Sequence, residues 1–276
     1  MPTLPFTQVD VFSTEPLGGN PVAVVHDADA LTSEQMQRFA NWTNLSETTF
    51  LLRPGSSDAD YRVRIFTTEE ELPFAGHPTL GSARAWLTAG GNPQAPGVVV
   101  QECGAGLVEV RVEEPHLAFA APPLFREGPL EAELRQRLVA GLGISPADVV
   151  SGSHLHNGPR WVVLQLTDAA TVLGLIPVPG PLAGLDVGVV GRHPAGHEAQ
   201  VEVRAFLSDG RAVAEDPVTG SLNAGIGQWL TDLPPRYVAA QGTVLGRSGR
   251  VHVERDGSRV WVGGATNVVV TGTTYL

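Results

Sequence analysis

The chain has 276 residues, of which 29 are Asp or Glu and 18 are Lys or Arg, so its formal net charge is −11 at pH 7. Nucleic-acid binding needs clustered basic residues to neutralise phosphates, so this charge argues against a nucleic-acid partner. The hydrophobic content is 42%. No apolar run approaches the ~18 residues of a membrane helix, and no signal-peptide pattern opens the chain, so we expect a soluble cytoplasmic protein. The single cysteine, Cys103, excludes an intrachain disulfide and a catalytic pair of thiols.

Strand-like runs, rich in β-branched residues and bounded by Gly, Pro or Asp, dominate the first half. They lie at 6–12, 21–26, 48–53, 61–67, 97–102 and 107–113. Helical patterns are fewer and cover 32–44 and 78 to about 88.

The second half has the same character. A helical pattern at 130–143 comes first, strand-like runs follow, and a last helix covers about 221–231. The strand-like runs lie at 160–166, 186–192, 201–207, 250–255, 259–264 and 266–272. Because strands and helices do not alternate regularly, the sequence predicts a strand-rich α+β fold.

A Pro-rich segment at 119–129 resists regular strand pairing and divides the chain almost in half. On either side, "ELPFAGHPTLG" (71–81) aligns without a gap with "EDPVTGSLNAG" (215–225), after "VRIF" (63–66) and "VRAF" (203–206). A weaker echo relates 18–25 to 157–164. These repeats predict two half-domains of similar topology, 1–120 and 121–276. The last strand, about 266–276, is a candidate to pack back onto the first half.

The two aligned segments each predict the start of a helix. Pro78 suits the first helical position, Ser221 suits an N-cap, and Gly76 suits a close backbone approach or a positive φ. A helix start offers unpaired N–H groups and a positive dipole end, so two facing starts would bind one small anion. Two ordinary capped helices are the alternative. The repeat, which sets His77 opposite Ser221 near Asp216, favours a functional site.

Glu47 follows a predicted helix and begins an apolar strand, where partial desolvation would suit it to general acid/base catalysis. The residues alone favour the alternative, an exposed loop or capping glutamate. Four other histidines form two close pairs but lack a supporting third ligand at a standard spacing, so we expect loop histidines and no metal site. These are His154, His156, His193 and His197.

At these motifs the chain resembles the phenazine-biosynthesis PhzF-like isomerase family, which shares the diaminopimelate epimerase fold. The resemblance runs from "FTQVDVFSTEPLGGNPVAVV" (6–25) through "NLSETTF" (44–50) to the two aligned segments. It implies two pseudo-symmetric half-domains, each a sheet rolled around a central helix, with the active site in the cleft between them. The general acid/base of the family corresponds to Glu47. The other polar site residues correspond to His77, Asp216 and Ser221, and Ser46 with the backbone at Gly76 and Gly220 would bind the substrate carboxylate.

The resemblance implies a cofactor-independent isomerase that moves a proton between carbons of a small carboxylated substrate. In the phenazine branch that substrate is trans-2,3-dihydro-3-hydroxyanthranilate. The alternatives are an epimerase or racemase of a small amino or hydroxy acid, a Ser/His/Asp hydrolase and a non-catalytic binder. Against hydrolysis, the segment around Ser221 has no G-x-S-x-G elbow. We also expect a homodimer, because the strand-rich halves offer edges that need covering.

Overall fold

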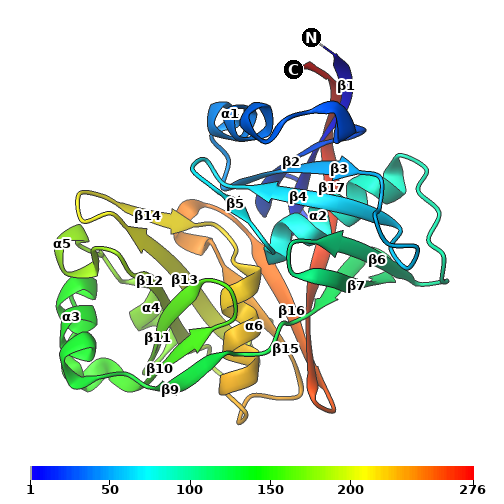
Figure 1. The fold of residues 1–276 in the computed structure, drawn as a ribbon. Helices are drawn as coiled ribbons and strands as arrows, with labels where there is room; N and C mark the ends of the chain where they lie inside the picture. Colours follow the sequence, from blue (N-terminus) through cyan, green and yellow to red (C-terminus); the bar gives the residue numbers. More distant parts are fainter. Residues whose placement is uncertain (1) are drawn as a thin grey trace. The chain divides into compact units, whose positions relative to one another are not determined.

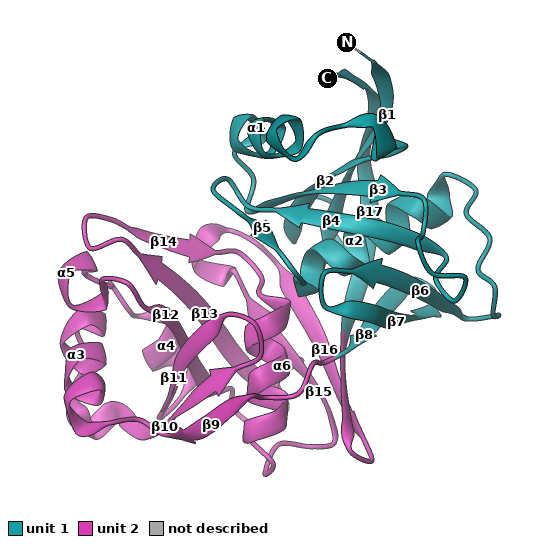
Figure 2. Ribbon diagram, viewed as in Figure 1, with its two compact units in different colours: residues 1–120, 263–276 teal, residues 121–262 magenta. Residues whose placement is uncertain are grey.

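The structure is a computed structural model that describes residues 2–276, and the chain divides into two compact units (Figure 2). Unit 1 comprises Met1–Ala120 and Gly263–Leu276, and unit 2 comprises Ala121–Val262. Strand β17 (Arg259–Tyr275) begins in unit 2 and ends in unit 1. Strands outnumber helices in both units, so the expected α+β class is confirmed.

Unit 1 is a barrel of strands around one helix (Figure 1). The strands are β1 (Thr3–Val11), β2 (Asn20–Val25), β3 (Glu47–Leu52), β4 (Tyr61–Phe66), β5 (Glu71–Leu72), β6 (Val98–Cys103), β7 (Gly106–Glu113) and β8 (His116–Ala120). The helices are η1 (Ala28–Ala30), α1 (Ser33–Thr43) and α2 (Gly76–Thr88). The order β17-β1-β2-β3-β4-β6-β7-β8 closes because β8 also pairs with β17, and α2 packs against β1, β2, β3 and β8.

Unit 2 repeats this plan around α6. Its strands are β9 (Arg126–Pro129), β10 (Val149–His156), β11 (Arg160–Leu166), β12 (Asp186–Arg192), β13 (Val201–Ser208), β14 (Val213–Asp216), β15 (Arg236–Gln241) and β16 (Gly249–Asp256). Its helices are α3 (Ala132–Leu142), η2 (Pro146–Asp148), α4 (Ala169–Leu173), α5 (Pro179–Leu182), α6 (Gly220–Trp229) and η3 (Thr243–Leu245). Helix α6 packs against β10 and β16, while α3 and α5 pack on each other.

The two units share their pairing pattern, which confirms the predicted pseudo-symmetry. In unit 1, β2–β3 and β4–β6 are the parallel pairs, and β11–β12 and β13–β15 are parallel in unit 2. Even an ion pair is repeated at equivalent places. Arg64 donates two hydrogen bonds to Glu71, and Arg204 donates two to Glu215. The sequence echo therefore reflects a repeated structural unit.

Close packing of α2 against the barrel depends on a glycine. A Cβ atom at Gly81 would lie 2.2 Å from Cγ1 of Val22 on β2, which no pair of carbon atoms tolerates. The absence of a side chain lets the helix approach the strand closely, in line with the use of glycine at close backbone contacts. This contact sets how closely α2 lies to β2.

Some expectations differ from the structure. The Pro-rich segment 119–129 was expected to resist pairing, but Arg126–Pro129 forms β9, antiparallel to β10. The runs 259–264 and 266–272 were expected as separate strands, and they form the single strand β17. Gly263, near the end of the first run, permits close strand approach, because a Cβ atom there would lie 2.4 Å from the Leu117 carbonyl oxygen.

Candidate active site

The start of α2 carries the first group of predicted site residues. Gly76 is the first residue of the helix, so Pro78 is the third and not the first as predicted. Pro78 is tolerated there because the first four N–H groups of a helix have no intrahelical partner. Gly76 does not have a positive φ. The N-cap residue of this helix is Ala75, whose side chain cannot cap the helix start by a hydrogen bond.

Glu47 and His77 meet beside this helix start. Glu47 is the first residue of β3, and its Oε2 atom lies 3.4 Å from Nε2 of His77. The side chains are 16% and 5% exposed, respectively. The structure therefore contradicts the alternative of an exposed loop glutamate. Ser46, the residue before Glu47, is exposed.

The environment of His77 keeps its imidazole uncharged. Burial lowers the pKa of His77 to about 3, although a hydrogen bond to the backbone of Pro21 opposes that shift. Nε2 makes no hydrogen bond within residues 2–276, so the bond to the Pro21 carbonyl comes from Nδ1. The side-chain nitrogen of Asn20 lies 3.5 Å from the same Nδ1 atom. Of the two neutral tautomers, the one that donates through Nδ1 to Pro21 presents the lone pair of Nε2 to Glu47, and the one that accepts from Asn20 at Nδ1 presents an N–H to Glu47.

The start of α6 carries the second group, in unit 2. Gly220 begins the helix without a positive φ, and Thr219 occupies the N-cap position that was predicted for Ser221. Ser221 lies in the first turn, where its hydroxyl accepts a hydrogen bond from the indole nitrogen of Trp161 at 3.0 Å. Its carbonyl oxygen accepts a bond of 2.8 Å from the side chain of Asn157. The Ser221 hydroxyl is thus held by a neighbouring strand.

Asp216 ends β14, three residues before the N-cap of α6. Its Oδ2 atom accepts a hydrogen bond of 2.5 Å from the Thr219 hydroxyl. A charge-assisted hydrogen bond of this length fixes the orientation of a carboxylate. The Thr219 side chain does not cap this helix start, but the Thr219 amide donates to the Oε1 atom of Gln241 at 3.0 Å.

The comparisons with known proteins agree with the repeated fold. A family model described as "Phenazine biosynthesis-like protein" matches residues 9–274. The chain is 36% identical to Antisense-enhancing sequence 1 of Schizosaccharomyces pombe, with 98% of each chain covered. It is 33% identical to trans-2,3-dihydro-3-hydroxyanthranilate isomerase of Pseudomonas aeruginosa, over 98% of this chain and 99% of that protein.

The chain belongs to the PhzF family. A crystal structure of a PhzF-family protein from Enterococcus faecalis is similar to it, with a TM-score of 0.82, 28% identity and full coverage of both chains. The membership makes this protein an isomerase-type enzyme and confirms the fold expected from the sequence. No helix within residues 2–276 is both long and apolar enough to span a bilayer.

Within this PhzF-family chain, the structure brings Glu47 and His77 together in unit 1. It places Asp216 and Ser221 at the start of α6 in unit 2. The other histidines do not all lie in loops as expected. His154 and His156 lie on β10, where His154 contacts Glu131 at 2.8 Å.

Several polar residues around these starts were missed by sequence reasoning. They are Asn20, Asn157, Trp161, Thr219 and Gln241. A usable signal existed for three of them, because the weaker echo between 18–25 and 157–164 contains Asn20, Asn157 and Trp161. Gln241 had no such signal, since it is a single polar residue at the end of an apolar run.

Proposed function

We propose that this PhzF-family enzyme moves a proton between carbon atoms of a small carboxylated substrate, with Glu47 as general acid and base. The observation that carries the proposal is the 3.4 Å contact between the Glu47 carboxyl group and the buried, uncharged His77. Positioned acid/base groups typically contribute about 10²–10⁴-fold to a rate. Proton transfer between carbons needs no chemistry beyond that of protein side chains, so we propose that no cofactor takes part.

We propose that His77 carries its proton on Nδ1, and this tautomer explains how Glu47 works. The lone pair of Nε2 attracts a protonated carboxyl group and repels an ionised one. Glu47 in its ionised form takes a proton from a substrate carbon, and its new O–H then donates to Nε2. The same proton, or one exchanged with solvent, is returned to a different carbon. This returns Glu47 to the carboxylate form, so the proton count balances over the cycle.

The helix starts are proposed to bind the anionic parts of the substrate. The N-cap residues of α2 and α6, Ala75 and Thr219, do not cap these helix starts with their own side chains. Such helix ends stabilise a carboxylate or a developing negative charge. We assign substrate-carboxylate binding to Ser46 and to the backbone at Gly76 and Gly220. Asp216 and Ser221 are proposed to orient the substrate or to relay protons.

The proposed substrate class follows a named relative. The Pseudomonas aeruginosa protein is named for isomerisation of trans-2,3-dihydro-3-hydroxyanthranilate. A substrate of that class carries a carboxylate for the helix starts and a carbon-bound proton for Glu47. Epimerisation of a small amino or hydroxy acid is the second candidate, because it uses the same proton removal and differs only in where the proton returns.

The experiment is incubation of this substrate in D₂O, followed by NMR. The proposal predicts an isomerised product that carries deuterium at the newly protonated carbon. An epimerase would instead introduce deuterium at the α-carbon of amino or hydroxy acids with inversion of configuration. An enzyme that catalyses neither exchange on any small carboxylic acid would contradict the proposal and leave the non-catalytic binder.

Hydrolysis by Ser221 has less support. Its hydroxyl is engaged by the Trp161 indole N–H, which can only donate and cannot serve as a general base. Labelling of Ser221 by a fluorophosphonate probe would restore this alternative.

A homodimer and a cytoplasmic location are also proposed. The terminal part of β17 exposes Val269, Val270 and Tyr275, with 39%, 44% and 69% of their surfaces accessible. Apolar side chains exposed on a strand offer a surface that a second copy of the chain would cover. Light scattering of the purified protein at twice the mass of 29.1 kDa would support the dimer, and a monomeric mass would contradict it.

A further inference from the structure

Gln241, the last residue of β15, is the centre of a buried hydrogen-bond cluster in unit 2. The residue is fully buried. Its Oε1 atom accepts from the Thr219 amide at 3.0 Å and from the Asn223 side chain at 2.9 Å. Its Nε2 atom donates to the Thr219 hydroxyl at 2.9 Å and to the Asp216 carbonyl oxygen at 3.2 Å. Both donors and both acceptor sites of the amide are therefore used.

These bonds form a directed relay that ends at Asp216. Because the Gln241 amide donates to the Thr219 oxygen, the Thr219 hydroxyl is left to donate its own hydrogen, and it does so to Asp216 Oδ2 at 2.5 Å. Successive hydrogen bonds polarise one another and strengthen the last one. The amide thus orients the hydroxyl that holds the carboxylate.

The repeated unit shows that this relay is not a general requirement of the fold. The gapless alignment sets Leu72 opposite Asp216 and Ala75 opposite Thr219. Strand register locates the counterpart of Gln241. The aligned motifs at 63–66 and 203–206 set Tyr61 opposite Val201. Tyr61 pairs with Gln101 in unit 1 and Val201 pairs with Ala239 in unit 2, so Gln101 corresponds to Ala239. Two residues further along, Cys103 corresponds to Gln241, so all three members of the relay are replaced together in unit 1.

Unit 1 also provides a matched amide without a carboxylate to orient. Gln101 on β6 is fully buried, and its Nε2 donates to the Thr79 hydroxyl at 3.0 Å. Its Oε1 accepts from the Tyr61 hydroxyl at 3.0 Å. The alignment sets Thr79 opposite Asn223. Each unit therefore ties its central helix to a neighbouring strand through a glutamine, but only unit 2 extends the tie to a carboxylate.

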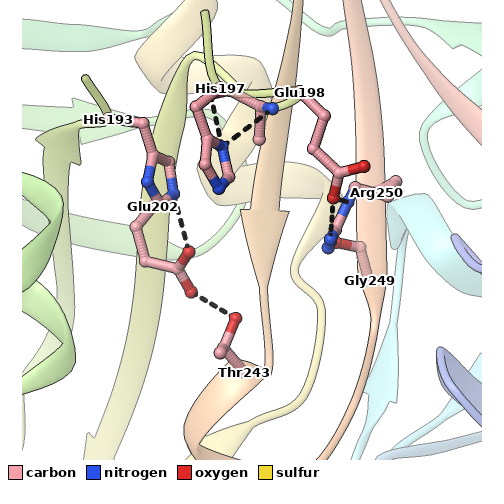
Figure 3. A network of polar contacts seen from close by, with 8 residues as sticks. His193, His197, Glu198, Glu202, Thr243, Gly249 and Arg250 are labelled. Carbon is pink, nitrogen blue, oxygen red and sulfur yellow. Dashed lines mark hydrogen bonds and ion pairs between the residues drawn. The ribbon is translucent and has the colours of Figure 1, made fainter. Parts of the chain in front are cut away.

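A second network fixes the strand end that carries Gln241 (Figure 3). Glu202 on β13 is 1% exposed, and its carboxylate accepts from the Thr243 hydroxyl at 2.7 Å and contacts His193 Nε2 at 3.0 Å. Thr243 lies two residues after Gln241, at the start of η3. The residue between them, Gly242, has a φ of 85°. A Cβ atom there would lie 2.7 Å from the Pro217 carbonyl oxygen, so the turn packs directly on the short connection between Asp216 and Thr219.

We propose that Gln241 is the positioning residue of the Asp216 carboxylate, acting through the Thr219 hydroxyl. The inference rests on the proposed participation of Asp216 in the reaction. Gln241 touches neither substrate nor reacting atoms in this account. It fixes the direction of the hydroxyl, and so the orientation of the carboxylate.

The test combines three single variants with one matched control. Gln241→Leu removes the amide at nearly constant volume, and Thr219→Val removes only the hydroxyl, in case the first variant fails to fold. Asp216→Asn removes the charge that the relay orients. Gln101→Leu in unit 1 removes an equally buried amide that has no carboxylate to orient. Denaturant unfolding of each variant measures the cost in stability.

A carboxylate titration by ¹³C NMR tests the inference without a substrate. In Gln241→Leu and Thr219→Val, the titration of Asp216 moves to higher pH, because the ionised form loses an oriented donor. In Gln101→Leu it stays where it is in the parent protein. An unmoved Asp216 titration in both unit 2 variants would overturn the inference, whatever their stability.

A double-mutant cycle on deuterium exchange with trans-2,3-dihydro-3-hydroxyanthranilate separates this inference from the proposed function. Gln241→Leu lowers kcat about tenfold in the parent protein, the loss of one hydrogen bond to a charged group, and less than about twofold in the Asp216→Asn background. An equal loss in both backgrounds would mean that Gln241 acts only on structure, against the inference. Full activity of Asp216→Asn would instead contradict the role of Asp216, while the titration still decides on Gln241.

Discussion

Nε2 of His77 lies 3.4 Å from Oε2 of Glu47, which places a neutral imidazole beside the carboxyl group proposed to move the proton. Helix α2 supplies the histidine and strand β3 the glutamate. Neither residue has a counterpart of its own type at the equivalent place in unit 2. The alignment sets Ser221 opposite His77. Val22 pairs with Glu47, and its counterpart in the weaker echo, Trp161, pairs with Asp186, the first residue of β12, so Asp186 takes the place of Glu47. A repeated scaffold thus carries different chemistry in its two units.

The buried His77 predicts a pH-dependent loss of stability. Its pKa is about 3 in the folded protein and near 6.5 when unfolded, so between these values the unfolded chain binds more protons. The contribution of neutral His77 to the free energy of unfolding is therefore fully present above pH 6.5 and is lost as the pH falls toward 3. From pH 7 to pH 4.5 we expect the parent protein to lose about 2 kcal/mol more free energy of unfolding than His77→Gln. Urea unfolding of both proteins at pH 7 and at pH 4.5 measures this difference. Equal losses in the parent protein and in His77→Gln would refute the lowered pKa of His77.

The repeated ion pairs predict unequal costs. Arg204 and Glu215 have side chains that are 4% and 12% exposed, whereas those of Arg64 and Glu71 are 20% and 42% exposed. We expect Glu215→Gln to lower the free energy of unfolding by about 3 kcal/mol, because it leaves a buried guanidinium without its counter-charge. Glu71→Gln should cost about 1 kcal/mol or less, since water solvates the partner. Denaturant unfolding of the two variants compares them directly, and equal costs would contradict this reading.

The contact of α2 with β2 predicts a compensating pair of substitutions. Gly81→Ala places a methyl group 2.2 Å from Cγ1 of Val22 and should destabilise the protein by about 1–3 kcal/mol. In a Val22→Ala background that clash is gone, so the same change should cost much less. A matched helical position is Gly225, whose Cβ atom would lie 3.1 Å from Leu155 Cβ and should be tolerated better. Costs that simply add in the double variant would show that the contact does not limit packing.

The sequence predicted most of the fold because the repeat and the β-branched runs follow the secondary-structure period. It missed β10, whose Ser153, His154 and His156 are buried polar residues, since a pattern of hydrophobic alternation does not register them. It ended the first run of β17 after Gly263 and Gly264 because glycine usually marks a turn, whereas Gly263 allows close approach to Leu117. Local patterns do not report such tertiary contacts.

Only some residues of the candidate site could be named from the sequence, because their contacts depend on tertiary packing. Glu47 and His77 were named from their own motifs, but their contact depends on how α2 packs inside the barrel. Ser221 was assigned the N-cap of α6, which Thr219 occupies, since helix ends are the least certain feature of a sequence. Gln241 was missed because a buried glutamine on a strand is recognisable only from its partners.

Deuterium exchange by Glu47→Gln tests the central claim most directly. The variant keeps the size of the side chain and loses the acid/base group. With trans-2,3-dihydro-3-hydroxyanthranilate in D₂O, we expect the exchange rate to fall about 10²–10⁴-fold relative to the parent protein. Glu71→Gln, a change of the same kind at a solvated ion pair of the same unit, should leave the rate within about twofold. Exchange by Glu47→Gln at the rate of the parent protein would contradict the account.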